Sequence, residues 1–206
     1  MADLSESGSQ RLEALWGGDF GDEYVDRNFA AGEGRREFWR GILGRLEAAT
    51  ALEVGCNIGG NVRWVAEVLG AGSVTGIDIN EKALAELRRR LPGVTAVHGR
   101  ARELPFADRS FDFAYTVGVL IHQSPEDLPT VMSEIVRCSD RFVMCAEYPA
   151  EEEPEEEVPY RGHRGALYRR DYGGLYQQWF PQLRLIEDGT LEEVAAYWIF
   201  ERAPSA

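Results

Sequence analysis

Short apolar runs alternate with longer amphipathic segments from residue 51 onward. Each run is four to seven residues long, a length typical of strands, and the segments between them repeat apolar residues every three or four positions, as helices do. The predicted strands are residues 51–54, 73–79, 94–98, 111–117, 141–146, 183–186 and 195–200. Such alternation favours a parallel sheet with helices on both faces and with ligands at the carboxyl ends of the strands.

Residues that typically begin and end helices support this pattern. Asn80 can cap the helix that follows the second strand, and Pro92 with Gly93 ends that helix. Gly70 occupies the C-terminal cap position of the preceding helix. We expect helices over residues 35–49, after the glycine-rich turn at 55–60, from residue 80 to residue 91, and from residue 124 onward.

The segment before residue 35 has a different character. Its apolar residues are scattered among Gly17, Gly18 and Gly21, which prevent one continuous helix. We therefore expect residues 1–34 to form a tail and a helical lid over a core at residues 35–206. A chain of 206 residues suits one domain, so residues 1–206 are predicted to be a single domain.

Charge and composition narrow the possible partners. The formal net charge of −13 and the absence of a Lys/Arg stripe argue against nucleic acid. Six glutamates around Pro154 repel one another, so residues 150–158 are predicted to be a solvated loop. The chain lacks an apolar run near the ~18 residues of a membrane span, so no membrane partner and a cytoplasmic location are expected. Its His and Cys residues lack ligand spacing, so we expect no metal site.

A glycine-rich turn between the first strand and its helix is the main candidate for a ligand site. Gly55 and its neighbours let the backbone approach a ligand, and the helix start offers free amides. A dinucleotide site would have a glycine where this chain has Asn57, and Glu53 precedes the turn, so NAD is disfavoured. Asp78 ends the second strand, 23 residues beyond Gly55, and can accept both hydroxyls of a ribose. The alternative is that Asp78 only caps the next helix, a role that Asn80 also suits.

These motifs occur in the order typical of a known enzyme class. The glycine-rich turn, the acid at residue 78 and the segment 104–112 before the fourth strand resemble the class I S-adenosylmethionine-dependent methyltransferases. The resemblance implies a Rossmann-like α/β fold with a seven-stranded, mostly parallel sheet, an N-terminal helical cap and S-adenosyl-L-methionine as cofactor. It implies a cofactor site made of Tyr24, Arg27, Asn28, Glu53, Gly55, Asn57, Gly59, Asp78, Ile79, Arg100, Ala101 and Thr116. Arg100 stands where many members have an acid, so its side chain is not expected to recognise the adenine.

A closer likeness covers more of the chain. Residues 16–28, 118–122, 147–148 and 160–163 resemble the methylases associated with pseudaminic acid biosynthesis. This likeness implies a small polar acceptor, such as a sugar or a sugar nucleotide, methylated at oxygen or nitrogen.

Three residues after the fourth and fifth strands are candidates for catalysis. His122 follows the fourth strand, and a near-neutral pKa would let it remove a proton from the acceptor. The alternative is that His122 binds backbone or caps a helix. Glu147 and Tyr148 end the fifth strand, where each could contact substrate or be structural.

A local basic cluster follows the acidic run. Tyr160, Arg161 and His163 are predicted to bind the acceptor, because cationic side chains there could hold a carboxylate or a phosphate. The alternative is that the nearby arginines pair with the glutamates at 151–157.

Three functions remain open at this point. The first is methyl transfer to a small, polar or anionic molecule. The second is an enzyme that consumes the cofactor without methylating and releases methylthioadenosine, because the binding motifs would be the same. The third is a binding protein without catalysis. The sequence does not indicate an oligomeric state.

Overall fold

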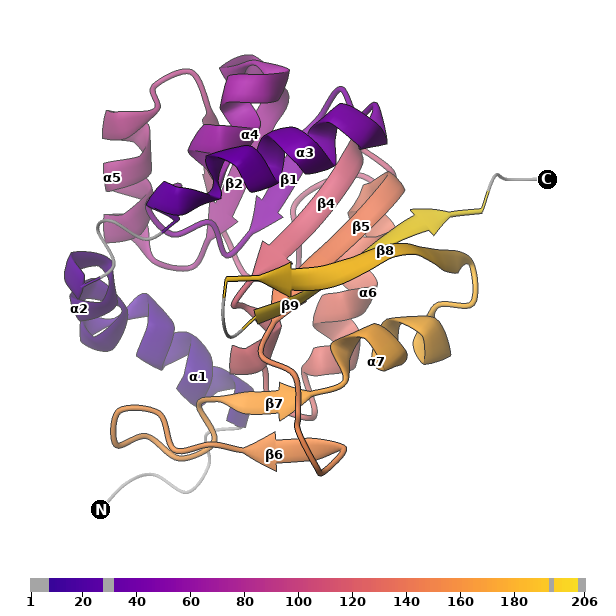
Figure 1. The fold of residues 1–206 in the computed structure, drawn as a ribbon. Helices are drawn as coiled ribbons and strands as arrows, with labels where there is room; N and C mark the ends of the chain where they lie inside the picture. The colour runs from indigo at the N-terminus through magenta and orange to yellow at the C-terminus, as the bar shows by residue number, and fades with distance from the viewer. Residues whose placement is uncertain (1–7, 28–31, 193–194, 204–206) are drawn as a thin grey trace.

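A seven-stranded sheet forms the centre of the protein (Figure 1). The computed structural model describes residues 8–27, 32–192 and 195–203. The sheet comprises β1 (Ala51–Val54), β2 (Val74–Asp78), β3 (Thr95–His98), β4 (Phe111–Val117), β5 (Ser139–Glu147), β8 (Leu183–Leu191) and β9 (Ala195–Arg202). Their order is β3-β2-β1-β4-β5-β9-β8; the first five are parallel and β9 is antiparallel to both its neighbours. The predicted Rossmann-like, mostly parallel sheet is confirmed.

Helices cover both faces of this sheet. They are α1 (Gly8–Gly17), α2 (Asp19–Arg27), α3 (Arg36–Leu46), α4 (Val62–Leu69), α5 (Glu81–Arg90), α6 (Leu128–Cys138) and α7 (Tyr172–Trp179). Buried residues of α3, α4 and α5 pack on one face, and those of α6 and α7 pack on the other. Successive strand residues point to opposite faces, so Ala51 belongs to the first core and Leu52 to the second.

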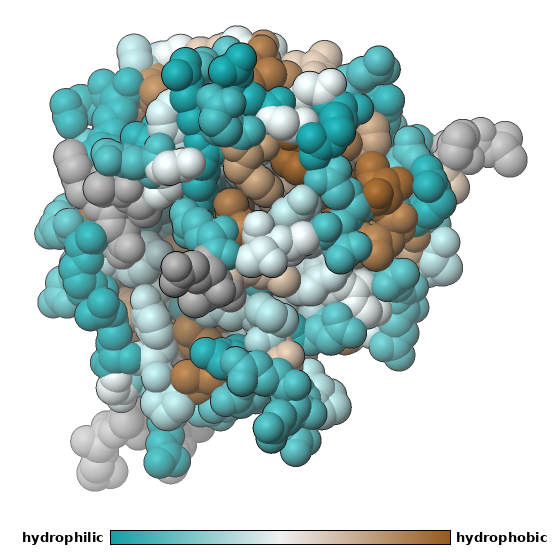
Figure 2. Space-filling view, in the orientation of Figure 1, coloured by the Kyte–Doolittle hydropathy of each residue, from teal (hydrophilic) through white to brown (hydrophobic). Residues whose placement is uncertain are grey.

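The N-terminal cap consists of two short helices that meet at Gly18, as the glycines predicted. Side chains of α1 and α2 line a cavity at the carboxyl ends of the strands. On the face shown in Figure 2, hydrophilic residues cover most of the surface and hydrophobic residues lie in small separate patches. Among the described residues, no helix is long and apolar enough to cross a membrane.

Two boundaries differ from the prediction by about four or five residues. The helix expected from residue 124 begins at Leu128, because Ser124 Oγ accepts the Asp127 N–H at 3.2 Å and holds a turn first. Strand β8 continues to Leu191 rather than residue 186, since its polar residues keep pairing with β9.

The predicted solvated loop at residues 150–158 also differs, because it contains a strand. Residues 155–157 form a strand, β6 (Glu155–Glu157), which pairs antiparallel with β7 (Tyr168–Arg170). Glu155 lies opposite Arg170, and Glu156 lies opposite Arg169. Opposite charges across the ladder offset the repulsion among the glutamates, which remain exposed.

Candidate functional site

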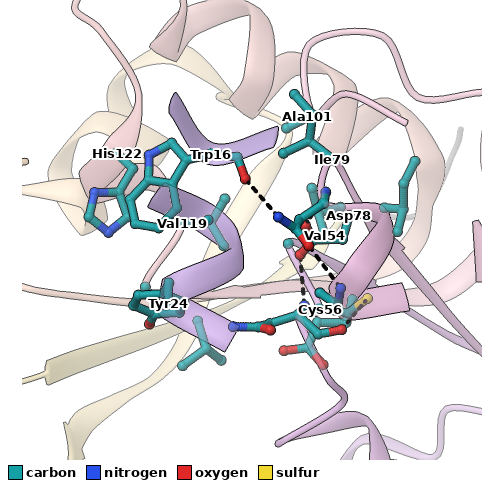
Figure 3. Close-up of a pocket in the computed structure, with 18 of the residues that line it drawn as sticks. Trp16, Tyr24, Val54, Cys56, Asp78, Ile79, Ala101, Val119 and His122 are labelled. Carbon is teal, nitrogen blue, oxygen red and sulfur yellow. Dashed lines mark hydrogen bonds between the residues drawn. The ribbon is translucent and has the colours of Figure 1, made fainter. Parts of the chain in front are cut away.

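A cavity of about 530 Å³ lies at the carboxyl ends of β1, β2, β4 and β5, beneath α1 and α2 (Figure 3). Loops after these strands and the two cap helices supply its lining. Its volume falls within the range of about 300–1,000 Å³ that is typical of small-molecule sites.

The glycine-rich turn forms the floor of this cavity. Gly55 has φ +74°, and a Cβ atom there would lie 2.4 Å from Val119 Cγ2, so only glycine fits. Asn57 has φ +47°, a left-handed conformation that Asn tolerates. Gly59, which was predicted to contact the cofactor, does not line the cavity. A Cβ there would lie 2.5 Å from Leu87 Cδ1, so Gly59 lets the turn pack on α5.

Asp78 joins the turn to the start of α5. Its Oδ2 accepts the Asn57 N–H at 2.7 Å, and its Oδ1 accepts the Asn80 N–H at 2.8 Å. Burial raises the pKa of Asp78, while the backbone amides of Asn80 and Asn57 oppose the rise. Asn80 caps α5 through a 2.8 Å bond from the Ala83 N–H, as predicted. Asp78 therefore lines the cavity and also fixes the geometry of the turn.

The side chain of Asn57 provides an unpaired acceptor. Its Oδ1 is buried and has no hydrogen-bond partner within the described part of the chain. An unsatisfied buried polar atom costs about 1–3 kcal/mol, which a ligand N–H would relieve. Among the other residues predicted to hold the cofactor, Ile79, Arg100 and Ala101 line the cavity, and Arg100 Nε lies 3.3 Å from a carboxylate oxygen of Glu13 in α1.

A buried polar network around Glu53 supports another wall of the cavity. Glu53 accepts from Asn61 Nδ2 at 2.8 Å and from the Tyr115 hydroxyl at 3.1 Å. Burial raises the pKa of Glu53 to about 8. Arg35 donates to Asn61 Oδ1 at 2.9 Å and to both carboxylate oxygens of Glu192, each at 2.8 Å.

Sequence reasoning missed Arg35 and Glu192 as cavity residues. They are 157 positions apart, and neither belongs to a motif. Trp16 was also missed as a lining residue, although it lies in a segment that carried the family likeness.

Four aromatic rings line the side of the cavity next to β4 and β5. Trp16 and His122 have ring centroids 4.3 Å apart, and Tyr24 meets Trp16 edge-on at 5.3 Å. Tyr148 lines the same cavity. Burial raises the pKa of Tyr24 to about 12, with smaller contributions from Tyr160 and Tyr148.

His122 is held by the backbone. Its Nδ1 lies 2.6 Å from the Ala166 carbonyl oxygen, which can only accept, so Nδ1 carries the proton and Nε2 carries a lone pair. Burial lowers the pKa of His122 to about 4, so the ring is neutral at neutral pH. This backbone contact is the alternative considered for His122, although the ring also lines the cavity.

Glu147 and Thr116, which were predicted to act in catalysis and in cofactor binding, lie behind the cavity lining rather than in it. Both are fully buried, and Glu147 Oε1 accepts from the Thr116 hydroxyl at 3.0 Å. The same carboxylate accepts the N–H groups of Val119, Leu120 and Ile121 at 3.1–3.2 Å. Glu147 therefore anchors the turn that includes the 3-10 helix Leu120–His122.

The predicted acceptor residues also lie outside the cavity lining. Tyr160 and His163 pack against Phe20 of the lid, with ring centroids 6.1 and 4.9 Å from it. Arg161 is exposed in a turn. Arg169 pairs with Glu151 and Glu156, and Arg170 pairs with Glu155, as the alternative for the nearby arginines expected.

Arg27 and Asn28 are two further lid residues that were predicted to hold the cofactor. Arg27 does not line the cavity, because it pairs with Glu23 at 3.2 Å and lies over the Phe20 ring. Asn28 lies outside the described residues.

Comparison with known proteins identifies similar chains. Residues 51–140 match the model of a methyltransferase domain. A phthiotriol/phenolphthiotriol dimycocerosates methyltransferase of Mycobacterium tuberculosis is 43% identical over 74 residues, which is 35% of this chain and 27% of that protein. The chain thus matches about a quarter of that relative's length.

Solved structures share the whole fold. The 1,6-didemethyltoxoflavin-N1-methyltransferase of Burkholderia thailandensis, with bound S-adenosylhomocysteine, has a TM-score of 0.76 and 19% identity, covering 98% of this chain and 94% of that one. The magnesium protoporphyrin IX methyltransferase of Synechocystis, also with S-adenosylhomocysteine, has a TM-score of 0.72 and 15% identity, covering 95% and 100%. The chain has the class I methyltransferase fold.

Proposed function

We propose that the protein is an S-adenosylmethionine-dependent methyltransferase acting on a small molecule. The observation that carries this proposal is the cavity at the ends of β1 and β2, where Gly55 and Asn57 lie beside the Asp78 carboxylate. The match of residues 51–140 to a methyltransferase domain supports it independently.

The residues present fit the cofactor. Asp78, with lone pairs beyond its two backbone bonds, suits ribose hydroxyls, and the unpaired Asn57 Oδ1 suits the amino group of the methionine moiety. Ile79 and Ala101 offer apolar contacts for an adenine ring. The net charge of −13 favours a cationic ligand such as a sulfonium.

The chemistry needs position more than acid–base strength. When bound, the cofactor supplies a methyl carbon to which the acceptor's lone pair forms a bond, while the carbon–sulfur pair stays on sulfur and the acceptor's proton leaves to water. The protein's part is to hold the acceptor in line and to exclude competing water. The cap helices cover the cavity, and His122 Nε2 can accept a hydrogen bond from an acceptor hydroxyl.

Calorimetric titration with S-adenosylmethionine and S-adenosylhomocysteine tests the proposal. Wild type and Asp188→Ala, which removes an exposed carboxylate, should bind both, whereas Asp78→Ala should bind them at least tenfold more weakly. No binding by wild type would overturn the proposal and favour a non-catalytic binding protein. Release of methylthioadenosine rather than S-adenosylhomocysteine during turnover would favour the non-methylating enzyme.

The likeness to methylases associated with pseudaminic acid biosynthesis supports a sugar or sugar nucleotide as acceptor. The aromatic side chains of Trp16, Tyr24 and Tyr148 in the cavity lining favour a different acceptor class, an aromatic compound.

A further inference from the structure

We propose that the methyl acceptor is an uncharged, planar aromatic compound bearing a hydroxyl or an N–H group, bound against Trp16, Tyr24 and Tyr148. This inference rests on the proposed methyltransferase function and names the substrate class for the same cavity.

The cavity has a cofactor half and an acceptor half, which follow the order of the strands in the sheet. Residues suited to the cofactor follow β1, β2 and β3, whereas Val119 and His122 follow β4 and Tyr148 follows β5. Figure 3 shows this division: Trp16, Tyr24 and His122 lie on one side, and Asp78, Ile79 and Ala101 lie on the other. Since β1 and β4 are neighbours, the acceptor half adjoins the glycine-rich turn.

Aromatic rings dominate the acceptor half. Trp16, Tyr24, Tyr148 and His122 all line it. Ring-on-ring packing stabilises a bound aromatic compound beyond the burial of its apolar area. Trp16 Nε1 is buried and has no hydrogen-bond partner among the residues that the structure describes, so it is available to a polar atom on a ring.

Charge in this half disfavours an anionic acceptor. Arg35 is the cation that reaches it among the described lining residues, and both carboxylate oxygens of Glu192 hold its guanidinium. Asp127 adds a negative charge to the same lining, and His122 is neutral. A carboxylate or phosphate entering here would lose hydration without gaining a counter-charge.

The size of the cavity and the acidity of the acceptor's hydroxyl also favour an aromatic compound. The cavity of about 530 Å³ has the size of a small-molecule site, and a single ring is a compact acceptor to bind beside the cofactor. A phenolic hydroxyl, with a pKa of about 10, ionises far more readily than an aliphatic hydroxyl. An aromatic hydroxyl therefore suits a site in which His122 is a weak base.

The test measures acceptor binding to protein saturated with S-adenosylhomocysteine, which cannot react. We would titrate catechol and 2-naphthol as aromatic probes, N-acetylglucosamine as a neutral sugar, and glucose 1-phosphate and octanoate as anions. The aromatic probes should bind at least tenfold more tightly than the other three. Tighter binding of the sugar or of either anion would overturn the inference.

Variants of the aromatic lining residues test where the aromatic probe binds. Trp16→Leu and Tyr148→Leu should each weaken binding of 2-naphthol about 3–10-fold, while Trp16→Phe and Tyr148→Phe should retain it within about twofold. Trp179→Leu, at a partly exposed tryptophan on α7, is the matched control and should bind as wild type. Unchanged affinity in both leucine variants would refute the placement. Failure to bind S-adenosylhomocysteine would refute the proposed function itself, whereas binding it but no aromatic probe would refute this inference alone.

Discussion

The buried carboxylate of Glu147 offers the sharpest test of how the fold supports the cavity. It accepts three backbone N–H groups and the Thr116 hydroxyl, and it is fully buried. Glu147→Ala would leave these donors without an acceptor. Each buried unpaired amide costs about 1–3 kcal/mol, so three cost roughly 3–9 kcal/mol.

We expect a value near the lower end of that range, about 3–4 kcal/mol, because the turn can shift toward the cavity and regain water. For a chain of this size, each kcal/mol lowers the melting temperature by about 2–4 °C, so 3 kcal/mol corresponds to about 6–12 °C. Glu147→Gln keeps one acceptor oxygen but turns an amide N–H₂ toward a donor. We expect it to cost about 1–3 kcal/mol.

Urea and thermal unfolding measure both variants, with Glu152→Ala as the control. Glu152 is exposed, so its replacement should change the free energy of unfolding by less than about 0.5 kcal/mol. If Glu147→Ala unfolds within about 1 kcal/mol of wild type, the amides do not depend on this carboxylate and the anchoring role is wrong.

Three further predictions follow from single sites. Burial raises the pKa of Glu53 to about 8 and that of Glu147 to about 7, so the folded protein holds more protons than the unfolded chain between about pH 4.5 and 8. The free energy of unfolding should therefore fall as pH rises through that window, and Glu53→Gln should flatten the curve; a rise with pH would contradict the assignment. Gly55→Ala should abolish S-adenosylhomocysteine binding in calorimetry, because its Cβ would lie 2.4 Å from Val119 Cγ2 at a positive φ; binding within threefold of wild type would count against the close approach. Glu13→Gln removes the ion-pair partner of Arg100 and Arg102. It should lower the free energy of unfolding in urea by less than about 1 kcal/mol, since these pairs are partly exposed. A larger loss would mean that the pairs hold the lid more strongly than exposed pairs usually do.

The sheet could be predicted because its signals are local. Apolar runs such as 111–117 are buried on both faces, so they remain visible as continuous runs. The end of β8 was missed because Glu187 and Asp188 belong to a strand with one neighbour, where polar residues face water. Periodicity detects a strand through burial, so a half-exposed edge is harder to detect.

The candidate site also has residues that the sequence could predict and residues that it could not. Gly55, Asn57 and Asp78 could be predicted as lining residues because their positions within the chain place them at strand ends. Tyr148 and Glu147 both end β5, yet Tyr148 lines the cavity while Glu147 points behind it, because successive side chains of an extended chain face opposite ways. Position at a strand end predicts the neighbourhood of a residue but not the direction of its side chain.

The parts of the cavity that sequence reasoning missed are those that long-range contacts create. Arg35 bonds to Glu192, which lies 157 positions later in the sequence, and Trp16 of the lid contacts His122 after β4. Both contacts lie in the acceptor half, whereas the cofactor half is built from turns that each occupy a short stretch of chain. Local motifs can therefore indicate a cofactor from sequence alone, because each group of residues proposed to contact it lies within a short stretch of chain. An acceptor is recognised by side chains whose proximity only the folded structure creates, so its chemical class has to be argued from rings, charges and volume in that structure.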